Sequence, residues 1–246
     1  MIFVINIIKA EHQKTKKSMS RIFIWSFPAL TFILAFVLTL GMKNAYAESV
    51  WNWWYTLLLP GMLAILCYLS MLREKKTGYY HLTTLPVCKK KLMLGKIFYI
   101  GSAILASNVI IFAGASFGGM LLTTRVPFIG AAISVLVLTV TQLWEIPLFL
   151  FLSTRFGMIT ELLVCLFLTV GGTIFASTGK WYFLVSSVPM RVLCPILHIL
   201  PNGLAAETGD TLLDVGVIVP GICLSVLWFF LITICFLNWF EKREEK

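Results

Sequence analysis

The sequence has 246 residues, of which 59% are hydrophobic and only 13% are charged, and its formal net charge is +9. A soluble domain of this size needs more charged residues to cover its surface, so the composition argues against one. The positive charge does not indicate a nucleic-acid partner, because the basic residues stand in short segments between long apolar runs, which is the pattern of membrane topology. We therefore expect an integral membrane protein.

Six apolar runs are long enough to cross a bilayer as helices, since about 20 residues span about 30 Å of hydrocarbon. Backbone polar groups at that depth must be hydrogen-bonded within their own segment, which favours helices, and the short alternating segments of a transmembrane barrel are absent from the sequence. The fold class that we predict is all-α integral membrane, with one transmembrane domain over residues 1–246 and no soluble domain. We expect its six spans at residues 22–41, 54–72, 97–122, 128–152, 159–177 and 216–238.

Lysine and arginine are distributed unequally between the two sides of these spans. Five precede the first span, seven lie in the loop after the second, one lies between the fourth and fifth, and three follow the sixth, which makes sixteen. By the positive-inside rule this side is cytosolic, so both termini are expected in the cytosol. The other side carries four basic residues, Lys43, Arg125, Lys180 and Arg191.

Two segments outside the spans have patterns of their own. Residues 1–21 begin with an apolar run, 2–8, that is too short to cross the membrane and is followed by basic residues, which favours an interfacial helix. Residues 178–215 contain two short apolar runs, Trp181–Val188 and Val192–Leu200, that are separated and flanked by prolines. Irregular backbone is not tolerated against lipid, so we expect external or re-entrant helices that are buried in protein or lie at the outer interface.

The longest cytosolic loop covers residues 73–96. Tyr79, Leu82, Thr83 and Pro86 follow helical spacing, which predicts a short amphipathic helix at the membrane surface. We expect the basic residues that follow to anchor the chain at anionic head groups. These residues are Lys89, Lys90, Lys91 and Lys96. On charge alone, the loop can equally be one that only fixes the topology.

The order of residues in this loop resembles the first cytosolic loop of type-2 ABC exporter permeases. The family pattern has a Glu-containing charged cluster, a glycine, a Leu-x-x-Leu-Pro stretch and a basic end. The matching positions are Glu74, Gly78, Leu82, Leu85, Pro86, Lys89 to Lys91 and Lys96. The segment Ala10-Glu11-His12-Gln13-Lys14 resembles the Ala-Glu-x-x-Lys that precedes span one in the same family. The layout of the whole chain is also similar.

The resemblance implies a permease subunit that is driven by a separate ATPase. The first loop would form a coupling helix that docks on the ATPase through Glu74, Gly78, Tyr79, Leu82, Leu85 and Pro86. ATP and Mg²⁺ would bind to that partner and no cofactor to this chain, whose sequence contains no Walker A pattern. We therefore do not expect this chain to be an enzyme.

The small size looks most like the permeases of lantibiotic self-protection exporters. That likeness implies two copies of the ATPase, a second six-span permease that is homologous or identical, and a bacterial plasma membrane. It also implies that the assembly removes cationic antimicrobial peptides from the membrane. Two alternatives remain, a non-transporting scaffold or sensor subunit and an intramembrane enzyme, although the acidic and histidine residues that an enzyme needs are not clustered in the spans.

Polar residues inside the fourth span form a second candidate site. Thr141 and Gln142 lie one turn before Glu145 on the same helix face, and Pro147 is expected to kink the helix nearby. Glu145 is interpreted either as a contact in the substrate route or at a subunit interface, or as a neutral buried group bonded to Gln142 or to a neighbouring helix.

Three further features have both a functional and a purely structural interpretation. Small residues at Gly114 and Gly118 give span three a face suited to close helix contact, at a subunit interface or by chance. Six cysteines and three histidines show no metal-ligand or disulfide spacing, so no metal site is expected. An acidic patch near the last span is interpreted as attracting cationic peptides or as an ordinary solvated loop, and it consists of Glu207, Asp210 and Asp214.

Overall fold

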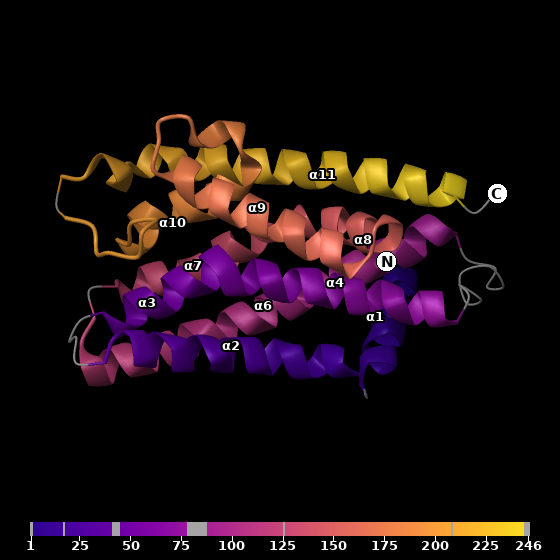
Figure 1. The fold of residues 1–246 in the computed structure, drawn as a ribbon, viewed down its shortest axis with the longest axis horizontal. Coiled ribbons are helices and arrows are strands. Elements are labelled where there is room, and N and C mark those ends of the chain that lie inside the picture. Colours follow the sequence, from indigo (N-terminus) through magenta and orange to yellow (C-terminus); the bar gives the residue numbers. More distant parts are fainter. Residues whose placement is uncertain are drawn as a thin grey trace.

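The computed structural model describes residues 2–16, 18–40, 45–77, 88–124, 126–207 and 209–243. Within these ranges the chain forms an elongated bundle of helices, and the only extended pairing is an isolated bridge between Ile199 and Ala205 (Figure 1). Five helices are long and apolar enough to cross a membrane, or six if α7 and α8, which meet at 42°, count as one broken span. The predicted all-α integral membrane fold is confirmed.

The helices along the bundle are α2 (Met19–Leu38), α3 (Tyr46–Trp53), α4 (Leu59–Lys76), α6 (Lys89–Leu122), α7 (Phe128–Gln142), α8 (Glu145–Arg155), α9 (Met158–Ala176) and α11 (Ile218–Arg243). Two further helices, α1 (Ile2–Thr15) and α10 (Val188–Leu197), lie at its two ends. Short 3-10 turns at Trp181–Phe183, Val185–Ser187, Thr211–Leu213 and Val215–Val217 complete the described chain.

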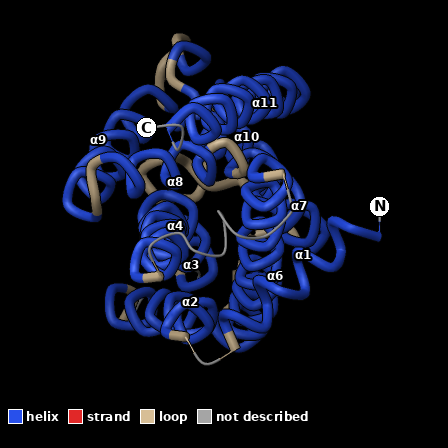
Figure 2. The backbone as a smooth tube through the Cα atoms, turned by 90° about the vertical axis from the view of Figure 1, so that its right-hand side faces the viewer, coloured by secondary structure: helices blue, strands red, loops and turns tan. Residues whose placement is uncertain are grey.

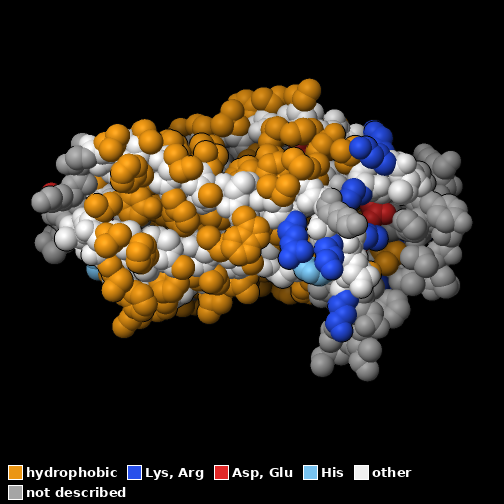
Figure 3. Space-filling view, turned by 90° about the horizontal axis from the view of Figure 1, so that it is seen from below, with side chains coloured by type: hydrophobic (Ala, Val, Ile, Leu, Met, Phe, Trp, Pro, Cys, Tyr) orange, Lys and Arg blue, Asp and Glu red, His pale blue; other side chains and the backbone are white. Residues whose placement is uncertain are grey.

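Both termini and the end of α4 lie at one end of the bundle, which we call the basic end (Figure 1). Lysine and arginine gather there, whereas hydrophobic side chains dominate the middle and the other half of the face shown in Figure 3. At this end α1 crosses the direction of the other helices and packs on α6. The placement of the termini on one side agrees with an even number of crossings. The cytosolic orientation of the basic end stays a prediction.

The continuous helix formed by α3 and α4 occupies the centre of the bundle, and α2, α9 and α11 lie around it (Figure 2). In its most apolar window 61% of the residues of Tyr46–Lys76 are buried, against 17% in α2 and 17% in α11. A soluble protein does not leave long apolar helices so exposed, because water would then contact their side chains. The outer helices therefore have the surface of a protein that lies in lipid.

Two helices are longer than the spans expected from the sequence. Lysine is a good helix former, so the run Lys89–Lys91 forms the first turn of α6 instead of preceding the helix. The second span is extended at its start by α3 through a π-helical segment, Trp54–Leu58. There the Leu59 N–H donates to the Trp54 carbonyl, five residues back, immediately before Pro60, which lacks a backbone donor.

The small-residue face of α6 is used for packing inside the chain. A side chain at Gly114 would overlap the ring of Phe32 in α2, and one at Gly118 would overlap the ring of Tyr46 in α3. Glycine at these positions lets the three helices approach closely. The hypothesis that this face forms a subunit interface is therefore not supported, because aromatic rings of the same chain already cover it.

The segment before the last helix folds into the bundle at the end opposite the basic end. The helix α10 packs on α7, α9 and α11, and nearly all its side chains are buried. Arg191 is among them, and its guanidinium donates hydrogen bonds to the carbonyl oxygens of Leu212 at 2.5 Å and Thr211 at 3.5 Å. Of the two expected environments, burial in protein and the outer interface, the described residues of α10 show burial in protein.

Candidate functional site: an ion cluster beside the first loop

Three helices meet at a buried group of charges at the basic end. Lys96 lies about two turns into α6. Its Nζ is 3.0 Å from Oε2 of Glu11 in α1 and 3.0 Å from Oε1 of Glu74 near the end of α4. Lys14, one turn after Glu11, is 2.9 Å from Oε1 of Glu11 and 3.2 Å from Oε1 of Glu74. We call these four residues the ion cluster. Its two ammonium groups and two carboxylates balance in charge.

Three of the four side chains in the cluster are shielded from solvent, whereas the Lys14 side chain is 39% exposed. The exposed fraction is 2% for Lys96, 5% for Glu11 and 3% for Glu74. Burying charges costs several kcal/mol per ion, and only good geometry and full pairing offset that cost. Every charge in the cluster has an opposite partner within hydrogen-bonding distance, so the cost is offset only while all three helices stay together.

The pKa values of the two α1 residues follow from this pairing. Burial alone would raise the pKa of Glu11, but Lys96 and Lys14 outweigh burial and hold it below its ordinary value of 4.5. Burial alone would lower the pKa of Lys14, but Glu11 and then Glu74 outweigh burial and raise it above 10.5. Glu11 and Lys14 are therefore both charged near neutral pH.

Contacts around the cluster bind α1 more firmly to its neighbours. The hydroxyl groups of Thr15 and Tyr99 are 2.5 Å apart, which joins the end of α1 to α6 one turn beyond Lys96. The Arg73 guanidinium donates a hydrogen bond of 3.3 Å to the Lys14 carbonyl oxygen, which joins α1 to α4. The helix α1 thus bridges the two helices that enter and leave the first loop.

The structure corrects the sequence analysis at Lys96. We expected its ammonium group at the lipid head groups, with those of Lys89, Lys90 and Lys91, but a side chain that is 2% exposed and paired with two carboxylates cannot reach them. Lys90 instead pairs with Glu241 in α11 at 2.8 Å, in an exposed position. The sequence did contain a signal for the cluster, because Glu11 and Glu74 are acids in two strongly basic segments.

Most of the expected coupling residues lie outside the described residues. These are Gly78, Tyr79, Leu82, Leu85 and Pro86. Glu74 is described, and it belongs to the last turns of α4 with its carboxylate turned into the ion cluster. It therefore lies outside the short loop helix, and its described contacts are with α1 and α6. The described parts of the loop are its two ends, Thr77 and Cys88, each next to a helix that the cluster holds.

The polar group of the fourth span lies at the break between α7 and α8. Glu145 is the first residue of α8, and Pro147 stands in its first turn. Proline is tolerated there because the first N–H groups of a helix have no acceptor within the helix. Thr141 donates its hydroxyl to carbonyl oxygens of its own helix. Gln142 and Glu145 are buried, and no hydrogen bond joins their side chains in the described structure. One oxygen of each therefore faces the interior without a partner.

Sequence analysis missed two other buried polar groups. Glu161 in α9 is fully buried with both carboxylate oxygens unpartnered. Asn108 in α6 accepts a hydrogen bond of 2.7 Å from the Trp54 indole and donates one of 2.9 Å to Thr139. A lone asparagine in a long apolar run was the available signal, because a polar side chain at membrane depth needs a partner on another helix. The described residues contain no group of three or more His, Cys, Asp or Glu placed to hold a metal ion.

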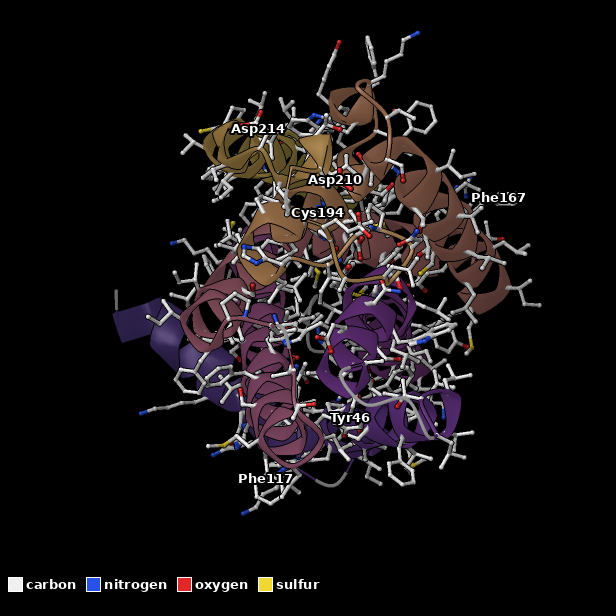
Figure 4. The ribbon with its side chains drawn as sticks, turned by 90° about the vertical axis from the view of Figure 1, so that its left-hand side faces the viewer. Tyr46, Phe117, Phe167, Cys194, Asp210 and Asp214 are labelled. Carbon is white, nitrogen blue, oxygen red and sulfur yellow. The ribbon has the colours of Figure 1, made fainter. Side chains whose placement is uncertain are left out.

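The acidic residues near the last span lie at the opposite end, with Asp210 over α10 and Asp214 beside the start of α11 (Figure 4). Asp210 accepts a 2.8 Å hydrogen bond from the Leu212 N–H, and Asp214 accepts one of 2.8 Å from the Gly216 N–H. Both aspartates therefore cap short 3-10 turns, and Glu207 is exposed. These capping contacts explain the two aspartates without a ligand.

Comparison with known families places these features in context. The sequence model of a family described as ABC-2 family transporter protein matches residues 7–153, more than half of the chain. The chain belongs to the ABC-2 family of transporter proteins. The matched region begins in α1 and ends in α8, so it includes the ion cluster and the first loop. No curated protein and no solved structure matches the chain. An ABC-2 protein of this kind is the membrane permease subunit of a transporter and acts with an ABC ATPase.

The ion cluster predicts an asymmetry between buried and exposed ion pairs. Replacing Lys96 by methionine leaves two buried carboxylates with only Lys14, and we expect a loss of about 3–5 kcal/mol in unfolding free energy. Replacing Lys90 by glutamine removes the exposed pair with Glu241 and should cost less than about 1 kcal/mol. Thermal unfolding in detergent micelles measures both effects. Similar small losses in the two variants would contradict a structural role for the cluster.

The lowered pKa of Glu11 predicts that the Glu11 carboxylate stabilises the folded protein at neutral pH and loses this effect in acid. A carboxylate whose pKa is lower in the folded state contributes stability above its ordinary value of 4.5 and loses it as the pH falls through the folded value. The stability difference between wild type and Glu11→Gln should therefore be constant from about pH 6 to pH 9 and shrink in acid. Lys14 does not disturb this window, because its pKa is raised above 10.5. A difference that stays constant into strong acid would show that Glu11 is not ionised in the cluster.

Proposed function

We propose that this permease subunit forms part of an ATP-driven exporter that removes lantibiotic-type antimicrobial peptides from the cell membrane. Its partners are two copies of a separate ATPase, which holds ATP and Mg²⁺, and a second six-span permease, homologous or identical. The basic end faces the cytosol of a bacterial cell. Membership of the ABC-2 family supports the permease role, while the peptide substrate rests on the likeness of size and layout to the self-protection permeases.

The observation that carries the mechanical part of this proposal is the ion cluster. The first loop leaves α4 after Lys76 and enters α6 at Lys89, and the cluster ties both helices and α1 together just beside it. A force applied to the loop is therefore passed to all three helices at once instead of bending one helix end. Rigid-body transmission of this kind requires firmly joined elements.

In this mechanism the ATPase pushes on residues 78–86 when it closes on ATP, with Tyr79, Leu82, Leu85 and Pro86 as the contacting side chains. The tied helices α4 and α6 are the central and the longest of the bundle, so their tilt moves the packing of α7, α8 and α9 against them. Glu145 is buried at the α7–α8 break, and it meets the cationic peptide only once this movement opens the break. The acidic patch of Glu207, Asp210 and Asp214 attracts the peptide at the opposite end, in addition to the capping role of its two aspartates.

The coupling role predicts that the loop can be changed without affecting the ion cluster or the stability that it provides. Replacing residues 78–86 by a Gly-Ser sequence of equal length keeps Glu74 and Lys96, so the fold and its thermal stability should be unchanged. Peptide-stimulated ATP hydrolysis by the assembled complex should fall to the basal rate of the ATPase. Loss of the ATPase from the purified complex would agree with the same role, whereas full stimulation by the variant would refute it.

The substrate is tested by killing assays in a sensitive host that expresses the chain with its ATPase and second permease. Resistance should rise for cationic lantibiotics and disappear when the ATPase cannot bind ATP. Glu145→Gln keeps the shape of the side chain and should reduce resistance about tenfold if the carboxylate offsets a peptide charge inside the membrane. Glu161→Gln is the matched control, because it also changes a buried acid. Equal effects of the two changes would favour a structural role for Glu145.

A second function, that of a sensor or scaffold subunit, has a different outcome in the same assay. A sensor would bind peptide and alter ATP hydrolysis without lowering the amount of peptide in the membrane. Measuring labelled peptide in membrane vesicles separates the two functions, because only an exporter depletes the peptide when ATP is supplied.

A further inference from the structure

A second basic site lies at the basic end, away from the ion cluster. A pocket of about 180 Å³ opens between the end of α4 and the turn that joins α8 to α9, and it is lined by Tyr68 and Lys75 of α4, by Ser153 and Arg155 of α8, and by Gly157 in the turn, among others. Its lining is more polar than that of the other pockets described, and no acidic residue takes part in it. We call it the α4–α9 pocket.

The two cations of this pocket have no acidic partner among the described residues. Lys75 and Arg155 are exposed, and in the described part of the structure neither forms an ion pair with a carboxylate. The contact recorded for Arg155 is with the Phe156 ring, whose centroid is 6.0 Å from the guanidinium carbon. Glu161, the acid in the first turn of α9, is fully buried and does not line the pocket. Within the described part of the chain, the pocket therefore holds two positive charges without a counterion.

The start of α9 follows directly after the pocket residue Gly157 and has backbone donors of its own. Gly157 precedes the helix with φ of +88° and has no side chain to cap it. The Glu161 N–H donates a hydrogen bond to the Gly157 carbonyl oxygen, which is the first backbone hydrogen bond at this helix start. The N–H groups before Glu161 thus point out of the helix start without a capping side chain. Such a helix start favours an anion, and α9 has 19 residues over which its dipole is summed.

The exposed face of α9, which begins two residues after Gly157, is apolar. Ile159 is 78% exposed, Leu163 50% and Phe167 74%, and their spacing of four residues places them on one face of the helix. Phe167 lies at the periphery of the bundle in the end-on view (Figure 4). A phospholipid whose head group binds at the pocket has acyl chains in the lipid that contacts this apolar face, whereas a free phosphate makes no contact with it.

We propose that the α4–α9 pocket binds the phosphate of an anionic phospholipid in the leaflet at the basic end, between Lys75 and Arg155, with an acyl chain along the exposed face of α9. The pocket holds a phosphate group and the start of its substituents, and it is too small for a peptide helix. Because the pocket borders the turn between α8 and α9, a bound lipid joins these helices to α4. This inference does not depend on which substrate the transporter carries.

The test uses the purified full-length chain and three probes: short-chain phosphatidylglycerol, phosphatidylcholine of the same chain length, and inorganic phosphate. Binding is measured by native mass spectrometry and by the shift in the midpoint of thermal unfolding. The wild type should bind phosphatidylglycerol and gain stability from it, with little effect of the other two probes. Equal binding of phosphatidylcholine would overturn the proposal, and protection by inorganic phosphate alone would assign the pocket to a free anion instead of a lipid.

The double variant Lys75→Gln with Arg155→Gln should bind phosphatidylglycerol about thirtyfold more weakly, since each basic residue near an anionic lipid surface contributes about a factor of five. The matched control is Lys76→Gln with Lys242→Gln, which removes the same charge at the same end from residues that do not line the pocket. The control should keep the wild-type affinity, and so should Arg155→Lys within about fivefold. An equal loss in the double variant and its control would show only general attraction to the basic end and would overturn the proposal.

Discussion

A balanced group of two positive and two negative charges, three of them buried, holds together the helices at the two ends of the first loop. Charges of this kind do not add much stability by themselves, because the cost of removing them from water nearly cancels their attraction. They instead select one arrangement of the helices, because any arrangement that separates Glu11, Glu74 and Lys96 leaves an unpaired charge buried. The cluster therefore allows one relative placement of α1, α4 and α6 and penalises the others. The two described ends of the first loop, Thr77 and Cys88, adjoin helices that are held in this placement.

The rest of the bundle is arranged around these tied helices. The helix from Tyr46 to Lys76 is the most buried of the long helices, and its π-helical segment brings Trp54 within reach of Asn108 in α6. On the other side α4 packs against α8 and α9, and the Cys67 thiol donates to the Ile146 carbonyl at the start of α8. The interior thus has polar contacts at several depths, and they join the central helix to the two sides of the bundle.

The sequence predicted the fold class well because membrane helices are governed by two strong local rules, apolar length and charge asymmetry. It predicted helix ends less well, since the run Lys89–Lys91 is both a basic anchor pattern and a good helix start. The ion cluster was out of reach in detail. Its members were each singled out by position or motif, but the pairing of Lys96 with Glu11, 85 residues apart, depends on how α1 turns back across the bundle.

The packing of the interior has a consequence for how such a protein handles cargo. Trp51, Trp54, Tyr55 and Trp144 are almost completely buried along the middle of the bundle, and α10 fills the end opposite the ion cluster. Among the described residues these rings leave no open channel through the middle of the bundle. A cargo path that includes Glu145 therefore requires α7 and α8 to move away from the central helix first.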